Sequence, residues 1–303
     1  MLKTAKCTRC GATHTVNNMV QTRSPKRGER HAYICLRCAT TNEHYHTSNN
    51  TIQGTRKANQ IGVGVEFETS FSDEKARNQM FEYGFIPTHD CSLNSEGNGS
   101  RYGYDRNACE YVSGIMQGLN KASKFCVTAE KLMQGEHMKV NESCGTHLHV
   151  SINSMKDAQG EKTYMGYITR FYNSLFTPLC EAMKNNPEKT IKLFGRYFDN
   201  HYTRSIDMGS YAHDRYNFIN VTNDTNIEYR LCKFNNAKQY QECMRFCVKV
   251  TQTIVANFCE HFNDEPKDAR RYPNKTAYRK HKADITAQKL VKYFFESAEK
   301  LEA

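Results

Sequence analysis

Three short segments of the chain each carry two ionisable residues separated by a single position. In chain order the pairs are Glu66 and Glu68 in GVEFET, His147 and His149 in THLHVS, and Glu228 and Arg230 in NIEYRL. Carboxylates and imidazoles bind divalent cations, and a guanidinium pairs with phosphate or carboxylate oxygens. Residues of these types could together support a metal-assisted reaction at a phosphate or carboxyl group.

The segments that carry these pairs have the alternating pattern of β-strands, in which side chains i and i+2 share a face. The opposite faces are expected to carry apolar residues: Val65 and Phe67, Leu148 and Val150, and Ile227 and Tyr229. A further strand pattern, NACEYVS, adds Glu110. If the ionisable faces belong to one sheet, their carboxylates would repel one another unless cations neutralised them. Many carboxylates with few imidazoles favour Mg²⁺ or Mn²⁺.

Each pair also has an ordinary structural interpretation when it is taken alone. Glu-x-Glu on a strand is most often a solvent-exposed face, and Glu-x-Arg is usually a cross-strand salt bridge. His-x-His can pack among aromatic side chains. The occurrence of all three pairs on separate strands favours a site over these interpretations.

Strand patterns separated by helical patterns of unequal length predict an α+β fold with an antiparallel sheet flanked by helices. Pro178 is expected to start a new segment within the helical pattern of 163–183, and Ser72 is expected to cap the helix of 72–84. Cys243, Cys247 and Cys259 follow a helical pattern and are expected to be small core residues. The expected elements are a strand in 61–71, a helix in 72–84, a strand in 107–116, a helix in 117–134, a strand in 146–153, a helix in 163–183, two strands in 215–234 and a helix in 237–262.

Two Cys-x-x-Cys pairs stand near the start of the chain, Cys7 with Cys10 and Cys35 with Cys38. Two such knuckles complete a tetrahedral four-thiolate site, so a structural Zn²⁺ in a small zinc-ribbon or knuckle module is expected. The polar stretch that follows has little apolar periodicity and is typical of a linker. The sequence thus predicts a zinc module in residues 1–42, a linker in 43–60 and a main domain in 61–303.

The chain has 303 residues and a formal net charge of +10, which favours anionic partners such as nucleotides, nucleic acid or acidic peptides, although a solvated basic surface has the same composition. No apolar run is long enough for a membrane span, so no membrane association is expected. Thirteen cysteines without a secretory signal predict a reducing, cytoplasmic location.

The ordered motifs GVEFE, HDCSL, CEYVS, CGTHLHVS and NIEYRL resemble the landmarks of the amidoligase family. That family is similar to the catalytic domains of glutamine synthetase and glutamate–cysteine ligase, and the resemblance covers roughly residues 61–234. It implies a glutamine-synthetase-like sheet and ATP-dependent joining of a carboxylate to an amine through an acyl phosphate. The substrates could be free amino acids, peptides or protein side chains. The resemblance allows an oligomer but does not imply a ring, because the zinc module stands in place of the domain through which glutamine synthetase forms its ring.

The resemblance also implies roles for particular residues. Glu66 would be a first metal ligand, Glu68 and Glu110 would hold a neighbouring ion, and Glu228 and His147 would ligate metal as well. His149 would face the nucleotide phosphates, and Arg230 would neutralise charge on the transferring phosphoryl group. Weaker candidates for phosphate or substrate contacts are Arg215, Asn220, Asp90 and Arg196. No Walker-type phosphate loop is present in the sequence.

Two other functions are consistent with the same residues. The zinc module, the basic charge and the many tyrosines and phenylalanines would also suit a nucleic-acid-binding protein. The His-x-His element with acidic residues would also suit a metal-dependent hydrolase, which would turn over without ATP.

Overall fold

The described residues of the computed structural model fall into two compact units, the first within 1–55 and 63–146 and the second within 56–62 and 147–303. The described ranges are 4–7, 11–15, 19–23, 32–35, 62–88, 93, 108–113, 116–117, 119–151, 168, 170–198, 217–223, 226–263 and 273–302. The expected linker in 43–60 lies outside them.

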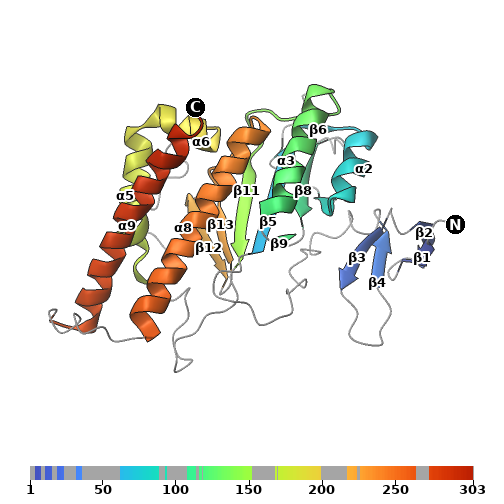
Figure 1. Ribbon diagram of the computed structural model, residues 1–303. Helices are drawn as coiled ribbons and strands as arrows, with labels where there is room; N and C mark the ends of the chain where they lie inside the picture. Colours follow the sequence, from blue (N-terminus) through green and yellow to red (C-terminus); the bar gives the residue numbers. More distant parts are fainter. Residues whose placement is uncertain are drawn as a thin grey trace. The chain divides into compact units, whose positions relative to one another are not determined.

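The first unit is built on an antiparallel sheet of β5 (Gly62–Thr69), β8 (Cys109–Ser113) and β7 (Phe85–Thr88), in that order (Figure 1). The short strand β9 (Met116–Gln117) also pairs with β5. Helices α2 (Glu74–Glu82) and α3 (Leu119–Gln134) complete this part. Three two-stranded ladders belong to the same unit: β1 (Thr4–Lys6) with β2 (Thr13–Thr15), β3 (Met19–Arg23) with β4 (Ala32–Cys35), and β6 (Phe71–Ser72) with β10 (Met138–Lys139).

Helix α3 covers the apolar face of this sheet. The ring of Phe125 on α3 lies 5.5 Å from that of Phe67 on β5 and 4.4 Å from that of Phe85 on β7. Phe67 and its strand neighbour Val65 are almost fully buried. Because side chains alternate along a strand, Glu66 and Glu68 leave the opposite face of β5.

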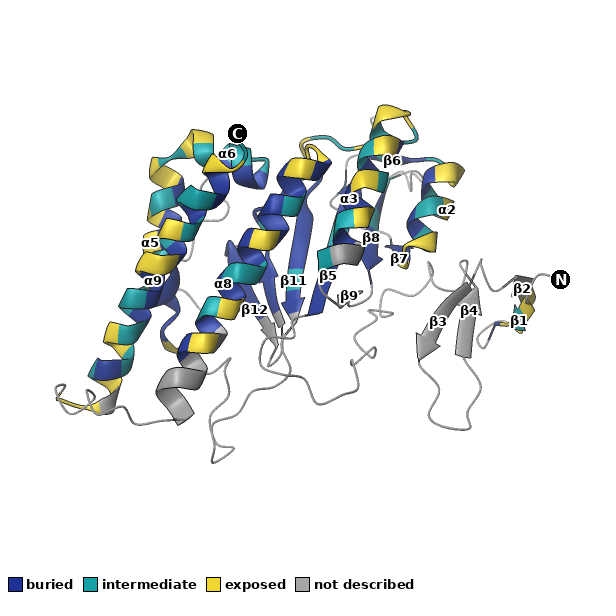
Figure 2. Cartoon of the chain, in the orientation of Figure 1, coloured by how far each residue is buried: buried dark blue, intermediate teal, exposed yellow. Residues whose placement is uncertain are grey.

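The second unit contains the antiparallel strands β12 (Ile219–Asn223), β13 (Asn226–Tyr229) and β11 (Thr146–Ser151), of which β11 belongs to it from His147 onward. Its helices are α5 (Tyr172–Asn185), α6 (Pro187–Phe194), α8 (Ala237–Asn263) and α9 (Lys275–Glu299). Both long helices, α8 and α9, turn a buried stripe inward and an exposed stripe outward (Figure 2).

Helices α6 and α8 cover the apolar face of the second unit's strands. Phe194 of α6 stacks edge-to-face with Phe218 beside β12 and with Phe246 of α8. The Tyr229 hydroxyl on β13 lies 2.8 Å from the Thr251 hydroxyl on α8. Since Tyr229 points to the helices, Glu228 points to the other face of the strand.

The described residues therefore contain six helices, and the main strands of each unit pair in antiparallel fashion, so the expected α+β class is confirmed. The expected segregation of apolar residues is also confirmed, because Leu148, Val150 and Ile227 are fully buried. Among the described helices none is both long enough and apolar enough to cross a membrane.

Two details of the predicted helices are wrong. Helix α5 runs through Pro178 instead of breaking there, because Leu175, Leu179 and other buried side chains around the proline outweigh its cost of about 3 kcal/mol. Helix α2 is capped by Asp73, whose Oδ1 accepts a hydrogen bond from the Ala76 N–H at 2.8 Å, and not by Ser72. The helix α9, the short helix α6 and strand β7 were not anticipated as separate elements.

Candidate metal-binding residues

In the first unit two carboxylates lie directly opposite each other on neighbouring strands. Glu68 of β5 pairs in register with Glu110 of β8, and one oxygen of each lies within 4.8 Å of the other. Glu68 is only 7% exposed. Like charges at such positions destabilise a sheet unless a cation or protons neutralise them. The pair is therefore a candidate for one side of a cation site.

Backbone and hydroxyl donors orient both carboxylates. The Gly145 N–H donates a hydrogen bond to Glu68 Oε2, and the Thr88 hydroxyl donates to Glu110 Oε2 at 3.1 Å. Gly145 belongs to the predicted Cys-Gly-x-His motif, which gives that glycine a direct role beside Glu68. Thr88 was missed at the sequence level, because its position opposite Glu110 follows only from the register of β7 on β8. These contacts hold the carboxylates in defined orientations, as metal ligands require.

Glu66 is placed two residues from Glu68, on the same face of β5, and it is half-buried. In register it lies opposite Val112 of β8. With Glu68 and Glu110 it gives this unit three carboxylates on one face of a sheet. An all-oxygen donor set of this kind suits Mg²⁺ or Mn²⁺.

In the second unit a buried carboxylate is surrounded by polar partners. Glu228 Oε1 lies 3.3 Å from His147 Nδ1 and also accepts a hydrogen bond from Arg230 Nη1. Glu228 Oε2 accepts a hydrogen bond from Asn220 Nδ2 at 2.9 Å. The side chains of Glu228 and His147 are 5% and 10% exposed. The sheet register explains this convergence, since Asn220 and His149 are both Cα partners of Glu228.

Two buried atoms in this network have no hydrogen-bond partner within the described part of the chain. They are the Oδ1 oxygen of Asn220 and the Nε–H of Arg230. A buried polar atom without a partner costs about 1–3 kcal/mol, so such atoms are uncommon in folded proteins. The Oδ1 oxygen can accept from a ligand or bind a cation, and the Nε–H can donate to an anion. The network thus fits a ligand that carries both a cation and anionic oxygens.

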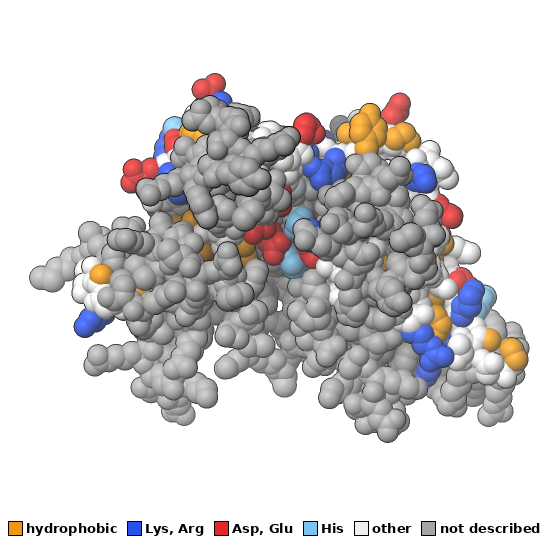
Figure 3. Space-filling model, turned by 180° about the vertical axis from the view of Figure 1, so that it is seen from behind, with side chains coloured by type: hydrophobic (Ala, Val, Ile, Leu, Met, Phe, Trp, Pro, Cys, Tyr) orange, Lys and Arg blue, Asp and Glu red, His pale blue; other side chains and the backbone are white. Residues whose placement is uncertain are grey.

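The predicted site residues are thus brought together in two sets. Glu66, Glu68 and Glu110 form the set of the first unit, and His147, His149, Glu228, Arg230 and Asn220 form the set of the second. Acidic and histidine side chains lie together on the face shown in Figure 3. Arg196 is half-buried just after α6, while Asp90 and Arg215 lie outside the described residues.

The predicted zinc ligands are described only in part. Cys7 follows β1 and is buried, and its carbonyl accepts a hydrogen bond from the Gly11 N–H at 2.9 Å. Cys35 ends β4, but its side chain, like Cys10 and Cys38, lies outside the described part.

The comparisons with known proteins add no relative. No protein-family model matches the chain, and no curated protein sequence matches it. The resemblance to the amidoligases therefore stays a prediction.

Proposed function

We propose that the protein is a metal-dependent ligase that uses ATP to join a carboxylate to an amine. The observation that carries this proposal is the buried network around Glu228, in which one carboxylate is held by His147, Asn220 and Arg230. An ordinary structural salt bridge needs no imidazole and leaves no orphaned donor. A site that binds metal and phosphate uses both.

The cofactor proposal follows from the types of donor atom. Glu66, Glu68 and Glu110 in the first unit, and Glu228 with the imidazole of His147 in the second, would each hold Mg²⁺ or Mn²⁺. When bound, these ions neutralise the charge of a triphosphate and of the phosphoryl group in transfer. The structural Zn²⁺ is proposed separately, for Cys7, Cys10, Cys35 and Cys38.

The proposed reaction has two steps that balance. An oxygen of the substrate carboxylate attacks the γ-phosphorus of ATP, the bond to the β-phosphate oxygen breaks, and ADP leaves with an acyl phosphate formed. The amine then attacks the acyl carbon, inorganic phosphate leaves, and the amine proton passes to a base. Positive charge near the phosphoryl oxygens lowers the first barrier.

Individual residues of this chain have distinct parts in that reaction. Arg230, whose Nε–H has no partner in the described part of the chain, donates to a phosphate oxygen. Asn220 and His147 hold Glu228 in the orientation in which it binds its ion. His149, half-buried on the same face as His147, contacts the nucleotide phosphates.

The proposal also covers the type of sheet, the cellular location and the targets of the protein. The antiparallel sheet with helices on its apolar faces supports a glutamine-synthetase-like arrangement of the main domain. None of the cysteines whose side chains are described forms a disulfide, and a cytoplasmic location is part of the same proposal. The zinc module and the basic charge would bring the enzyme to a peptide, protein or nucleic-acid target.

Trapping the acyl phosphate tests the proposed reaction. The chain is incubated with ATP, Mg²⁺ and a panel of carboxylates, with hydroxylamine as the amine. We expect ADP release together with a hydroxamate for at least one carboxylate, and loss of both with Glu228→Gln but not with the exposed control Glu299→Gln. ADP release without any hydroxamate would contradict the ligase and indicate simple ATP hydrolysis.

The two other functions give different results in the same samples. A metal-dependent hydrolase would act on its substrate without ATP. A nucleic-acid-binding protein would bind nucleic acid with steep salt dependence, and Glu228→Gln would leave that binding unchanged. Either result, obtained without ATP-dependent hydroxamate formation, would replace the proposal.

A further inference from the structure

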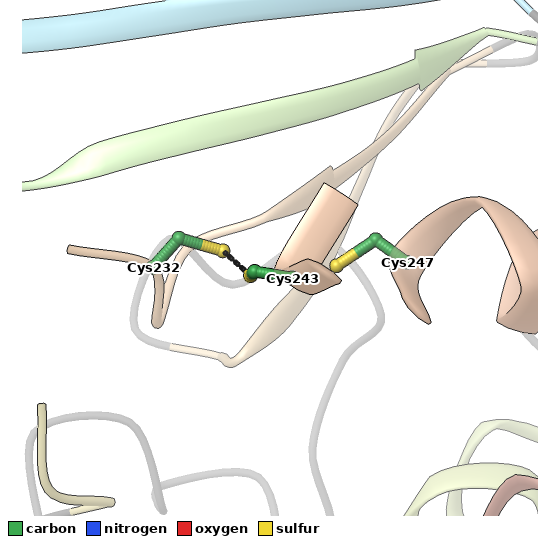
Figure 4. Close-up of side chains that lie close together, drawn as sticks. All are labelled: Cys232, Cys243 and Cys247. Atoms are coloured by element: carbon green, nitrogen blue, oxygen red, sulfur yellow. Dashed lines mark hydrogen bonds between the residues drawn. The ribbon is translucent and has the colours of Figure 1, made fainter. Parts of the chain in front are cut away.

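Three thiols from two separate elements meet in the core of the second unit (Figure 4). Cys232 lies just after β13, while Cys243 and Cys247 lie one turn apart on α8. The sulfur atoms of Cys232 and Cys243 are 3.3 Å apart, and all three sulfurs lie within 4.8 Å of one another. All three side chains are fully buried. We call these residues the three-thiol cluster.

The cluster differs from cysteines that only fill space in a core. A buried cysteine usually packs as a small apolar side chain among carbons. Cys180 on α5 behaves in this way, and burial raises the pKa of its thiol to about 12. Hydrogen bonds from the thiols of Cys243 and Cys247 instead hold the pKa of Cys232 well below its usual value. The three sulfurs thus face one another, as the ligands of one cation would.

We propose that Cys232, Cys243 and Cys247 bind a soft cation with a filled d shell, namely Zn²⁺ or Cu⁺. A Zn–S bond of about 2.3 Å in a tetrahedral site places neighbouring sulfurs about 3.8 Å apart. The observed spacing, from 3.3 Å to at most 4.8 Å, brackets that value. Sulfur-only ligation favours soft cations and disfavours Mg²⁺ and Mn²⁺.

Charge and protons are consistent with such a site. Binding displaces the protons of all three thiols to solvent, and Zn²⁺ offsets two of the three negative charges while Cu⁺ offsets one. Burial raises the pKa of the Cys243 and Cys247 thiols, so their deprotonation depends on the cation. The charge of Arg196 also favours the thiolate of Cys232.

The site would join the segment that follows β13 to helix α8. Cys232 is two residues beyond Arg230 in that segment, while the other two ligands belong to α8. A cation bound by all three would tie the end of β13 to α8 through metal–sulfur bonds. This inference does not depend on the proposed ligase reaction.

The test uses the full chain with Cys7, Cys10, Cys35 and Cys38 replaced by Ser, so that the three-thiol cluster is the one candidate sulfur site left among the described residues. This background chain is loaded in separate samples with Cd²⁺, Zn²⁺ or Cu⁺ and then dialysed. We expect about one equivalent of cation per chain and a thiolate-to-Cd²⁺ absorption band. Tighter retention of Zn²⁺ or of Cu⁺ identifies the native cation.

Substitutions within the cluster provide the comparison. Cys243→Ala should lose both the bound cation and the absorption band. The matched control Cys180→Ala, which removes a buried thiol elsewhere in the same unit, should keep both. X-ray absorption on the loaded background chain should show three sulfur neighbours, and it needs no substitution in the cluster. Coordination by oxygen and nitrogen alone, or equal cation content in Cys243→Ala and Cys180→Ala, would overturn the proposal.

Discussion

His147 Nδ1 lies 3.3 Å from Glu228 Oε1, and the neighbouring strands β11 and β13 hold both side chains away from solvent. Burying a carboxylate in this way is unfavourable unless charge and hydrogen bonds compensate it. Arg230 and Asn220 supply part of that compensation. The free energy of unfolding should therefore depend on the groups that surround Glu228.

Removing the Glu228 carboxylate should destabilise the protein strongly. Glu228→Ala leaves the Arg230 guanidinium partly buried without its partner, so we expect a loss of about 3–5 kcal/mol in the free energy of unfolding. Urea denaturation measures the loss. The control Glu299→Ala removes a carboxylate that is 61% exposed, and it should change stability by less than about 0.5 kcal/mol. Equal effects of the two substitutions would show that the network contributes nothing particular.

Neutralising one carboxylate of the opposed pair should separate repulsion from metal binding. Without divalent cations, Glu110→Gln should raise the melting temperature slightly, because Glu68 no longer faces a like charge. With Mg²⁺ or Mn²⁺ the order should reverse, because the wild type gains stability from binding and the variant does not.

Thermal unfolding with and without the cation measures both effects. Glu82→Gln on the exposed side of α2 is the matched control, and it should shift with the cation as the wild type does. If neither cation changed the melting temperature of the wild type, the carboxylate pair would be ruled out as a metal site.

The sequence allowed the faces of the strands to be predicted, but not the contacts across them. Alternation alone placed Phe67 and Tyr229 in the core, and therefore Glu68 and Glu228 on the other face, because side chains reverse at every strand residue. The contact of Thr88 with Glu110 could not be predicted, because it depends on the register between two strands. The three-thiol cluster could not be predicted either, because it depends on how α8 packs against the segment that follows β13. The helix that continues through Pro178 could not be predicted for the same reason, because the burial of neighbouring side chains decides whether a helix tolerates a proline.

Gly195 should be intolerant of any side chain, although it contacts no proposed ligand. Its φ of +81° is left-handed, and a Cβ there would collide with the carbonyl oxygen of Lys233. Gly84 has a φ of +85°, yet no described atom lies within 4 Å of its Cβ position. Gly84→Ala should therefore cost only the backbone strain of about 1–2 kcal/mol, and Gly195→Ala clearly more.

Chemical denaturation of the two alanine variants tests this comparison. If Gly195→Ala cost no more than Gly84→Ala, the close approach of α6 to the Lys233 carbonyl would be wrong.

Stability should depend on pH through Asp73, the cap of helix α2. Partial burial alone would raise the pKa of this carboxyl, but the Ala76 N–H and the neighbouring His137 outweigh it and hold the pKa below its usual value. A lowered folded-state pKa stabilises the protein above the unfolded value, and this contribution is lost as pH falls through the folded value.

The variant Asp73→Asn keeps an acceptor for the cap but removes the charge. Near pH 7 the wild type should be more stable by about 0.3–1 kcal/mol, and the difference should vanish as the pH falls through the lowered pKa of Asp73. Urea denaturation across this range measures it. A difference that stayed constant with pH would mean that the charge of Asp73 is irrelevant.

Calorimetric titration of ATP, with and without Mg²⁺, tests the central claim that the network around Glu228 belongs to a metal-dependent nucleotide site. We predict binding only when Mg²⁺ is present, weakened by more than about 100-fold in Glu228→Gln, while the exposed control Glu299→Gln binds as the wild type does. ATP binding that persists without Mg²⁺, or that survives Glu228→Gln, would contradict the account.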